Sequence, residues 1–132
     1  MLKFKPKHFA ISVADMEASI NWYRDILGFE ITGKEYAPNC GSNITIMSNG
    51  IIDVEIFLHD DTQPMSPERS DPDLDVKTQG LKHMCFAVED LNETIEYFKS
   101  KGVKILVGPV DFASNKLIYI TDNSGNLLEF MQ

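Results

Sequence analysis

Cysteine and long hydrophobic runs are scarce in this sequence. Its two cysteines, Cys40 and Cys85, are too few to cross-link 132 residues into a disulfide framework, and neither belongs to a CxxC motif. We therefore expect two free thiols in a reducing compartment. The first residues lack the apolar run of a secretory signal, and no later stretch approaches the roughly eighteen apolar residues of a membrane span. These absences predict a cytoplasmic protein that does not enter a membrane.

Basic residues are also few. The chain has 12 Lys and Arg against 20 Asp and Glu, which gives a formal net charge of −8. Nucleic acids and anionic membrane surfaces are bound mainly through Lys and Arg, so this balance argues against both as partners. The expected partner is a small molecule. With 132 residues, of which 43% are apolar, the chain is long enough for one domain with an ordinary hydrophobic core.

The clearest positive feature is an internal repeat. A stretch that reads HFAISVADMEASINWYRDILGFEI returns later as HMCFAVEDLNETIEYFKSKGVKI. In this alignment His8 corresponds to His83, 75 residues later, and Glu55 corresponds to Glu129, 74 residues later. Each half of the chain therefore carries one histidine and one glutamate at matching places.

The first half is expected to form a β-α-β-β-β unit. Asp15 is a good helix N-cap, and apolar residues recur after it at helical spacing until Gly28, a typical C-terminal stop. Alternating and β-branched segments predict strands, and Asn49-Gly50 predicts a two-residue hairpin loop between the last two strands. The predicted elements are a helix at 15–27 and strands at 5–13, 29–37, 42–48 and 51–58.

The second half repeats this plan less regularly. Asp90 and Glu93 resemble a capping box at the start of the second helix. Gly108-Pro109 is expected to interrupt the strand structure. The strand that would complete the copy of the first half is expected just after it. The predicted elements are a helix at 90–101 and strands at 81–88, 103–107, 110–113, 116–121 and 127–131.

A polar segment, residues 59–79, separates the two halves. It contains three prolines and six acidic residues and shows no periodicity. A loop of about twenty residues inside a compact domain is unusual and is often functional. We interpret this one as a linker in preference to a lid over a pocket. The single domain, residues 1–132, then comprises module one at 1–58, the connector at 59–79 and module two at 80–132.

The repeated histidines and glutamates suggest a metal site. Side chains on a strand alternate between its two faces, so each of His8, Glu55, His83 and Glu129 lies on one definite face of its strand. If the halves pack as a pseudo-twofold pair, these four faces can line one cleft. Two imidazoles and two carboxylates suit Ni, Zn, Co, Mn or Fe(II), and six-coordinate geometry leaves two positions for water or substrate. A single histidine on a strand is more often structural. The recurrence of both residue types in both halves favours the metal site.

Taken together, these features resemble the vicinal oxygen chelate superfamily, which includes glyoxalase I, methylmalonyl-CoA epimerase and extradiol dioxygenases. The resemblance rests on the repeated segments and on IDVEIF, GLKHMCFAVEDL and ITDNSGNLLEFM, and it extends over nearly the whole chain. It implies an α+β fold of two βαβββ modules related by pseudo-twofold symmetry, which form a curved mixed sheet around a metal cleft. It also implies a homodimer and one divalent metal ion held by His8, Glu55, His83 and Glu129.

The full ligand set implies a lactoylglutathione lyase-like metalloenzyme. Such an enzyme acts on a small α-oxo or α-hydroxycarbonyl compound, or on a thiol hemithioacetal, through an enediolate that the metal stabilises. Glu129 or Glu55 would shuttle the proton, with Glu129 favoured. The PER motif at 67–69, followed by GLKH at 80–83, further resembles a bacterial subgroup of glyoxalase-like lyases. Glutathione-using relatives carry an arginine where this chain has Ser12, which argues against glutathione as the thiol.

Two other functions stay open from the sequence. Bleomycin-sequestering relatives share the fold and enclose a ligand without metal catalysis, although they generally lack the four ligands. The other alternative is an epimerase or dioxygenase of the same superfamily. An acyl-CoA epimerase must admit a phosphate-rich handle, for which this acidic chain has no cluster of Lys or Arg. The dioxygenases have three ligands and no glutamate at the position of Glu55.

Overall fold

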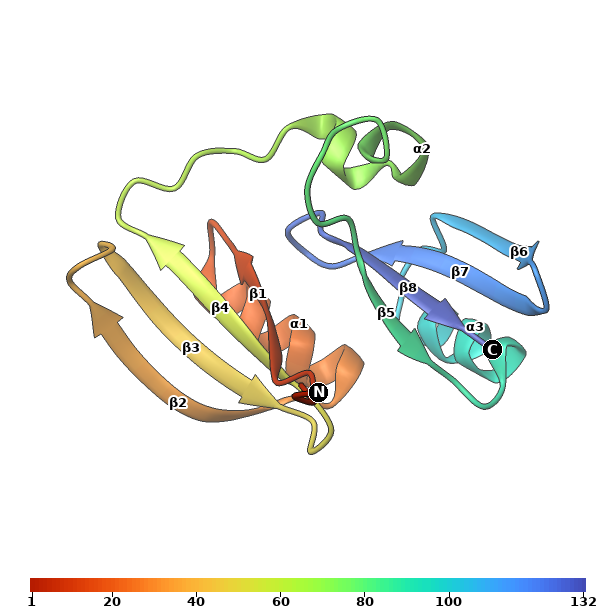
Figure 1. Cartoon of the computed structure of the whole chain (residues 1–132), viewed down its shortest axis with the longest axis horizontal. Coiled ribbons are helices and arrows are strands. Elements are labelled where there is room, and N and C mark those ends of the chain that lie inside the picture. The colour runs from red at the N-terminus through yellow and green to blue at the C-terminus, as the bar shows by residue number, and fades with distance from the viewer. The chain divides into compact units, whose positions relative to one another are not determined.

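The computed structural model describes all 132 residues and divides them into two compact units, Met1–Pro64 and Met65–Gln132. Each unit is a β-α-β-β-β module built on one four-stranded mixed sheet (Figure 1). The α+β class and the two repeated βαβββ modules are therefore confirmed. No helix is both long enough and apolar enough to cross a membrane.

The first unit places its first strand beside its last. The sheet order is β1-β4-β3-β2, in which β1 and β4 are parallel and the other pairs are antiparallel. Two segments that lie far apart in the sequence thereby become neighbours. The elements are β1 His8–Ser12, α1 Met16–Leu27, β2 Glu30–Ala37, β3 Ser42–Ser48 and β4 Asp53–His59.

The helix of the first unit starts and stops as the sequence predicts. The Asp15 carboxylate accepts a hydrogen bond of 2.9 Å from the backbone N–H of Ala18. Gly28 ends the helix in the left-handed conformation, with φ at 70°, where a side chain would be strained. One face of α1 packs on the sheet and contacts β4. The buried core of this unit comprises Val13, Ile20, Tyr23, Phe29, Ile44, Met47, Val54 and Ile56.

The connection between β3 and β4 differs from the prediction. The strands end at Ser48 and restart at Asp53, so the loop has four residues, and the expected two-residue hairpin is wrong. The side-chain oxygen of Asn49 accepts hydrogen bonds of 3.0 Å from the backbone N–H groups of both Ile51 and Ile52. This side-chain turn lengthens the loop because it gives the backbone an alternative to the sheet ladder.

The second unit repeats the topology of the first. Its sheet order is β5-β8-β7-β6, with β5 and β8 parallel and the other pairs antiparallel. Asp90 caps the helix as Asp15 does in the first unit, through a hydrogen bond of 2.9 Å from the backbone N–H of Glu93. The elements are β5 Met84–Ala87, α3 Leu91–Ser100, β6 Val107–Phe112, β7 Asn115–Thr121 and β8 Leu127–Met131.

One strand, β6, replaces the two short strands expected around Gly108-Pro109. The predicted strand at 103–107 is wrong except for its last residue, and the expected chain break lies inside β6. Because β6 is an edge strand with a register shift between Val107 and Val110, it tolerates a proline that would interrupt a central strand. A Cβ at Gly108 would lie 2.6 Å from the carbonyl oxygen of Leu117, so only glycine fits there.

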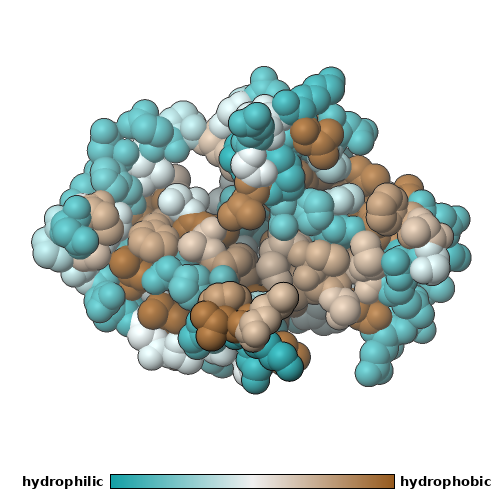
Figure 2. Space-filling view, viewed as in Figure 1, coloured by the Kyte–Doolittle hydropathy of each residue, from teal (hydrophilic) through white to brown (hydrophobic).

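The polar segment between the strands of the two modules is partly helical. It contains the 3-10 helix η1 at Pro67–Ser70 and the short helix α2 at Pro72–Asp75, which the sequence analysis did not predict. From Met65 onward this segment belongs to the second unit. Figure 2 shows mostly hydrophilic side chains over the visible face of the η1 and α2 region. We call residues 65–82, which overlap most of the predicted connector at 59–79, the connector segment below.

Candidate metal centre

The first candidate pair lies on the sheet face opposite α1. Val54 and Ile56, the neighbours of Glu55 on β4, are fully buried, so Glu55 points to the other face. His8 is the first residue of β1 on that same face, because Ala10, two residues on, is the direct partner of Glu55. His8 Nε2 lies 3.3 Å from Glu55 Oε2, with the two side chains 45% and 24% exposed.

The second candidate pair has the same arrangement in the second unit. Cys85 on β5 is the direct partner of Glu129 on β8, and His83 lies two residues before Cys85. His83 Nε2 lies 2.6 Å from Glu129 Oε2, and the two side chains are 28% and 6% exposed. In both units the histidine therefore precedes the partner of the glutamate by two residues. Alternation along parallel strands places the two side chains on one face and within reach of each other.

The surroundings of the two glutamates differ. The cross-strand neighbours of Glu55 are Ala10 and Ile46, which carry no polar side-chain group. The corresponding neighbours of Glu129 are Cys85 and Tyr119. The second pair is thus surrounded by polar groups and is the more deeply buried of the two.

Burial and the nearby carboxylate perturb the groups around Glu129. Burial, together with the negative charge of Glu129 and a hydrogen bond to it, raises the pKa of Cys85 to about 11. Burial and the negative charge of Glu129 also raise the pKa of Tyr119 to about 12, with further contributions from Cys85 and Asp73 and a smaller one from a hydrogen bond to Glu129. The Tyr119 ring also meets the imidazole of His83 edge-on at 5.1 Å. Cys85 is a free thiol.

Each pair suits two neighbouring positions on one cation. Two donor atoms bound at about 2.0–2.2 Å from a metal, at right angles, lie about 3 Å apart. The separations of 3.3 Å and 2.6 Å lie on either side of that value. The structure gathers no group of three or more His, Cys, Asp or Glu side chains that could hold a metal ion. It therefore brings the four predicted ligands together as two pairs, one in each unit, and the complete set of four stays a prediction.

Sequence reasoning missed some neighbours of the second pair. Tyr119 shares the parity of Leu117 and Thr121 on β7, so strand alternation could have placed it on the face of Glu129. The ion pair between Arg69 and Asp75 could not be found this way, because both residues lie in an aperiodic segment. The third histidine, His59, is exposed at the end of β4, and its Nδ1 accepts a hydrogen bond of 2.9 Å from the backbone N–H of Asp61.

Comparisons with known proteins agree with this architecture. Residues 5–130 match the Glyoxalase/Bleomycin resistance protein/Dioxygenase superfamily. The Escherichia coli protein YaeR is 30% identical over 128 residues, which cover 95% of this chain and 93% of YaeR. A probable lactoylglutathione lyase from Synechocystis is 24% identical over 127 residues, covering 95% of this chain and 92% of that protein. The crystal structure of a glyoxalase family protein from Enterococcus faecalis superimposes with a TM-score of 0.80 at 26% identity and covers 97% of both chains.

Proposed function

The chain belongs to the glyoxalase/bleomycin resistance protein/dioxygenase superfamily, and from this premise we propose that it is a metal-dependent lyase or isomerase of the glyoxalase I type. Members of this superfamily are commonly enzymes that act on small molecules and typically bind a divalent metal. The proposed substrate is a small α-oxo or α-hydroxycarbonyl compound, or a hemithioacetal formed with a thiol. The observation that carries the proposal is the matching His–Glu pair on the same sheet face of each unit.

The proposed ligands of the metal are His8 and Glu55 from the first unit with His83 and Glu129 from the second. Their neutral nitrogens and charged oxygens suit Ni, Zn, Co, Mn or Fe(II), and the two carboxylates balance the 2+ charge. When bound, such a cation acts as a Lewis acid that polarises the substrate oxygens and acidifies the adjacent C–H bond.

Glu129 is the favoured proton carrier. Its side chain is only 6% exposed, so a proton that the carboxylate takes from substrate carbon is shielded from exchange with bulk water. Tyr119 and Cys85, its cross-strand neighbours, place a hydroxyl and a thiol beside the carboxylate, where they can hold its orientation while the proton moves. Glu55, which is 24% exposed and lies beside Ala10 and Ile46, lacks such donors. It is therefore the second candidate for the proton carrier.

Glutathione is not the proposed thiol. Ser12 lies on the same face of β1 as His8, at the position where the resemblance places an arginine in glutathione-using enzymes. An uncharged hydroxyl cannot form the bidentate contact that an arginine makes with the carboxylate of a ligand. An activity screen with methylglyoxal and a panel of thiols therefore shows whether glutathione or another thiol supports turnover.

Elemental mass spectrometry of the purified protein, followed by that screen, tests the proposal. We expect about one divalent metal ion for each set of four ligands. EDTA should abolish turnover, and addition of the metal should restore it. Glu129→Gln and Glu55→Gln should abolish turnover with the fold intact, whereas Glu96→Gln, which changes an exposed residue of α3, should not. A protein that takes up none of the five metals contradicts the proposal and favours a ligand-binding role without metal.

A further inference from the structure

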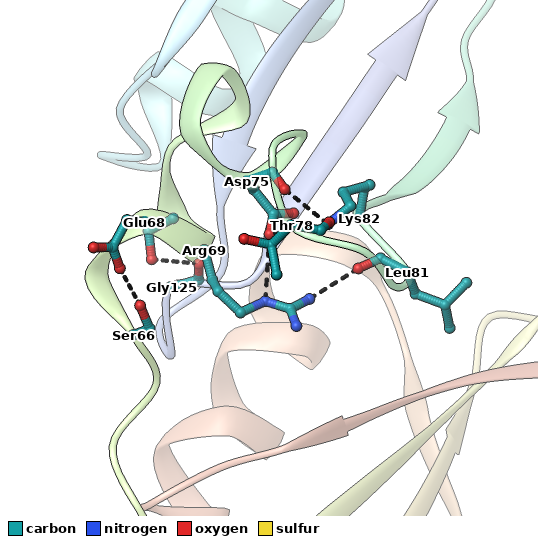
Figure 3. Close-up of polar contacts among 9 residues, drawn as sticks. Ser66, Glu68, Arg69, Asp75, Thr78, Leu81, Lys82 and Gly125 are labelled. Atoms are coloured by element: carbon teal, nitrogen blue, oxygen red, sulfur yellow. Dashed lines mark hydrogen bonds and ion pairs between the residues drawn. The ribbon is translucent and has the colours of Figure 1, made fainter.

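A buried carboxylate lies between two cations in the connector segment (Figure 3). Asp75 is 2% exposed, and its Oδ1 lies 3.6 Å from Arg69 Nε and 3.4 Å from Lys82 Nζ. Its other oxygen, Oδ2, is buried and has no hydrogen-bond partner. The interactions of this carboxylate are therefore its ion pairs with Arg69 and Lys82. A charge this deeply buried is tolerated because both cations neutralise it.

Both cations also bind the backbone of the connector segment. Arg69 Nη2 donates a hydrogen bond of 2.9 Å to the carbonyl oxygen of Leu81. Lys82 Nζ donates one of 2.8 Å to the carbonyl oxygen of Asp75 and another to that of Thr78. The two residues immediately before His83 are thus both fixed to the segment that contains η1 and α2.

The same segment also contacts the turn that precedes Glu129. The Ser70 hydroxyl donates a hydrogen bond of 2.8 Å to the carbonyl oxygen of Gly125, in the turn between β7 and β8. A Cβ at Gly125 would lie 2.7 Å from Ser70 Oγ, so a larger residue there would have to displace the Ser70 side chain. The connector segment therefore ends next to His83 and also touches the turn that leads into the strand of Glu129.

The two units hold their histidines differently. His8 is part of the sheet, since it is paired with Asp53 in the β1–β4 ladder. His83 lies one residue outside the equivalent ladder, which begins at Met84 paired with Leu128. In the second unit, the contacts of the Arg69–Asp75–Lys82 network reach the chain just ahead of this histidine.

We propose that Asp75 is a positioning residue for His83, and that the connector segment is a support for the metal ligand and neither a linker nor a lid. This inference rests on the proposed function for its link to metal binding. Groups that orient a ligand without touching the metal commonly change metal affinity by about 10–100-fold when they are removed. Loss of the Asp75 charge should release Arg69 and Lys82, and with them the backbone just ahead of His83.

The test compares Asp75→Asn with Asp90→Ala in the full chain. Asp75→Asn keeps the shape of the side chain and removes its charge. Asp90→Ala removes the N-cap of α3 and destabilises the same unit without touching the network. The measurements are Zn and Ni affinity, by competition with a chelating dye, and hydrogen exchange at the amides of residues 81–85. We expect Asp75→Asn to weaken metal binding at least tenfold and to speed exchange at these amides, whereas Asp90→Ala changes the affinity less than twofold.

A second pair of variants keeps the test decisive if Asp75→Asn does not fold. Lys82→Met keeps most of the aliphatic stem and should weaken metal binding at least threefold, and Lys82→Arg, which restores the cation, should recover most of the loss. Wild-type affinity and exchange in both Asp75→Asn and Lys82→Met would overturn the inference. If the wild-type chain binds no metal, the proposed function fails, whereas the exchange measurement still decides whether Asp75 positions His83.

Discussion

The imidazole Nε2 of His83 lies 2.6 Å from Glu129 Oε2, slightly closer than the atoms of an ordinary N–H···O hydrogen bond. The corresponding atoms of His8 and Glu55 are 3.3 Å apart, and both side chains are more exposed than their counterparts in the second unit. One repeated pair of residues therefore has two environments. The His83–Glu129 pair, which is more buried, depends on protein groups for its polar contacts. The His8–Glu55 pair can form polar contacts with water instead.

This asymmetry predicts different costs for the two histidine-to-alanine variants in metal-free protein. His83→Ala removes a partner of a nearly buried carboxylate and should lower the free energy of unfolding by about 1–3 kcal/mol. His8→Ala leaves Glu55 open to water and should change that free energy by less than about 0.5 kcal/mol. Urea denaturation in the presence of EDTA measures both. Equal effects of the two substitutions would show that burial of Glu129 does not matter for stability.

Tyr119→Phe tests the hydroxyl that faces Glu129. The variant removes a polar group from beside a carboxylate that is only 6% exposed, so we expect a loss of about 1 kcal/mol in the free energy of unfolding. Tyr36→Phe is the matched control. The Tyr36 hydroxyl donates to Asp60 at 2.8 Å, but it does so at the surface, where water replaces it and the cost should be below about 0.5 kcal/mol. Denaturation midpoints that fall equally in the two variants would contradict the difference.

The repeat made much of the fold predictable. Matching histidines, glutamates and capping aspartates recur in both halves, and each half forms one His–Glu pair, His8 with Glu55 and His83 with Glu129. The misses arise where a side chain or a distant backbone group decides the geometry. Asn49 accepts two hydrogen bonds and so lengthens a hairpin loop, which no periodicity reveals.

The aperiodic connector was the hardest region to predict. Its helices are only four residues long, too short for a hydrophobic period to appear in the sequence. Its acidic residues look like an ordinary solvated run, yet Asp75 is buried between two cations that are 6 and 7 residues away in the chain. Ser70 reaches Gly125, which is 55 residues away. Contacts of this kind depend on the folded arrangement of the unit, which local sequence does not specify.

The helix caps provide a matched pair across the repeat. Asp15 and Asp90 each accept one backbone hydrogen bond of 2.9 Å from the residue three positions later. Replacement of either by alanine should therefore cost about 1 kcal/mol in the free energy of unfolding, and the two costs should agree within about 0.5 kcal/mol. Replacement by serine should restore most of the loss. A cost near zero for only one of the two variants would mean that the repeated caps are not equivalent in energy.

Gly108 and Gly50 separate backbone strain from steric clash. Both have positive φ, at 98° and 86°, so alanine at either position should cost about 1–2 kcal/mol through strain alone. A Cβ at Gly50 meets nothing within 4 Å, whereas a Cβ at Gly108 would lie 2.6 Å from the backbone oxygen of Leu117. That oxygen belongs to the neighbouring strand β7 and cannot move without breaking the pairing, so Gly108→Ala should cost about 2–5 kcal/mol in total. Thermal and urea unfolding of both variants measure the difference, and a Gly108→Ala protein as stable as Gly50→Ala would show that the edge strand β6 yields to the added methyl group.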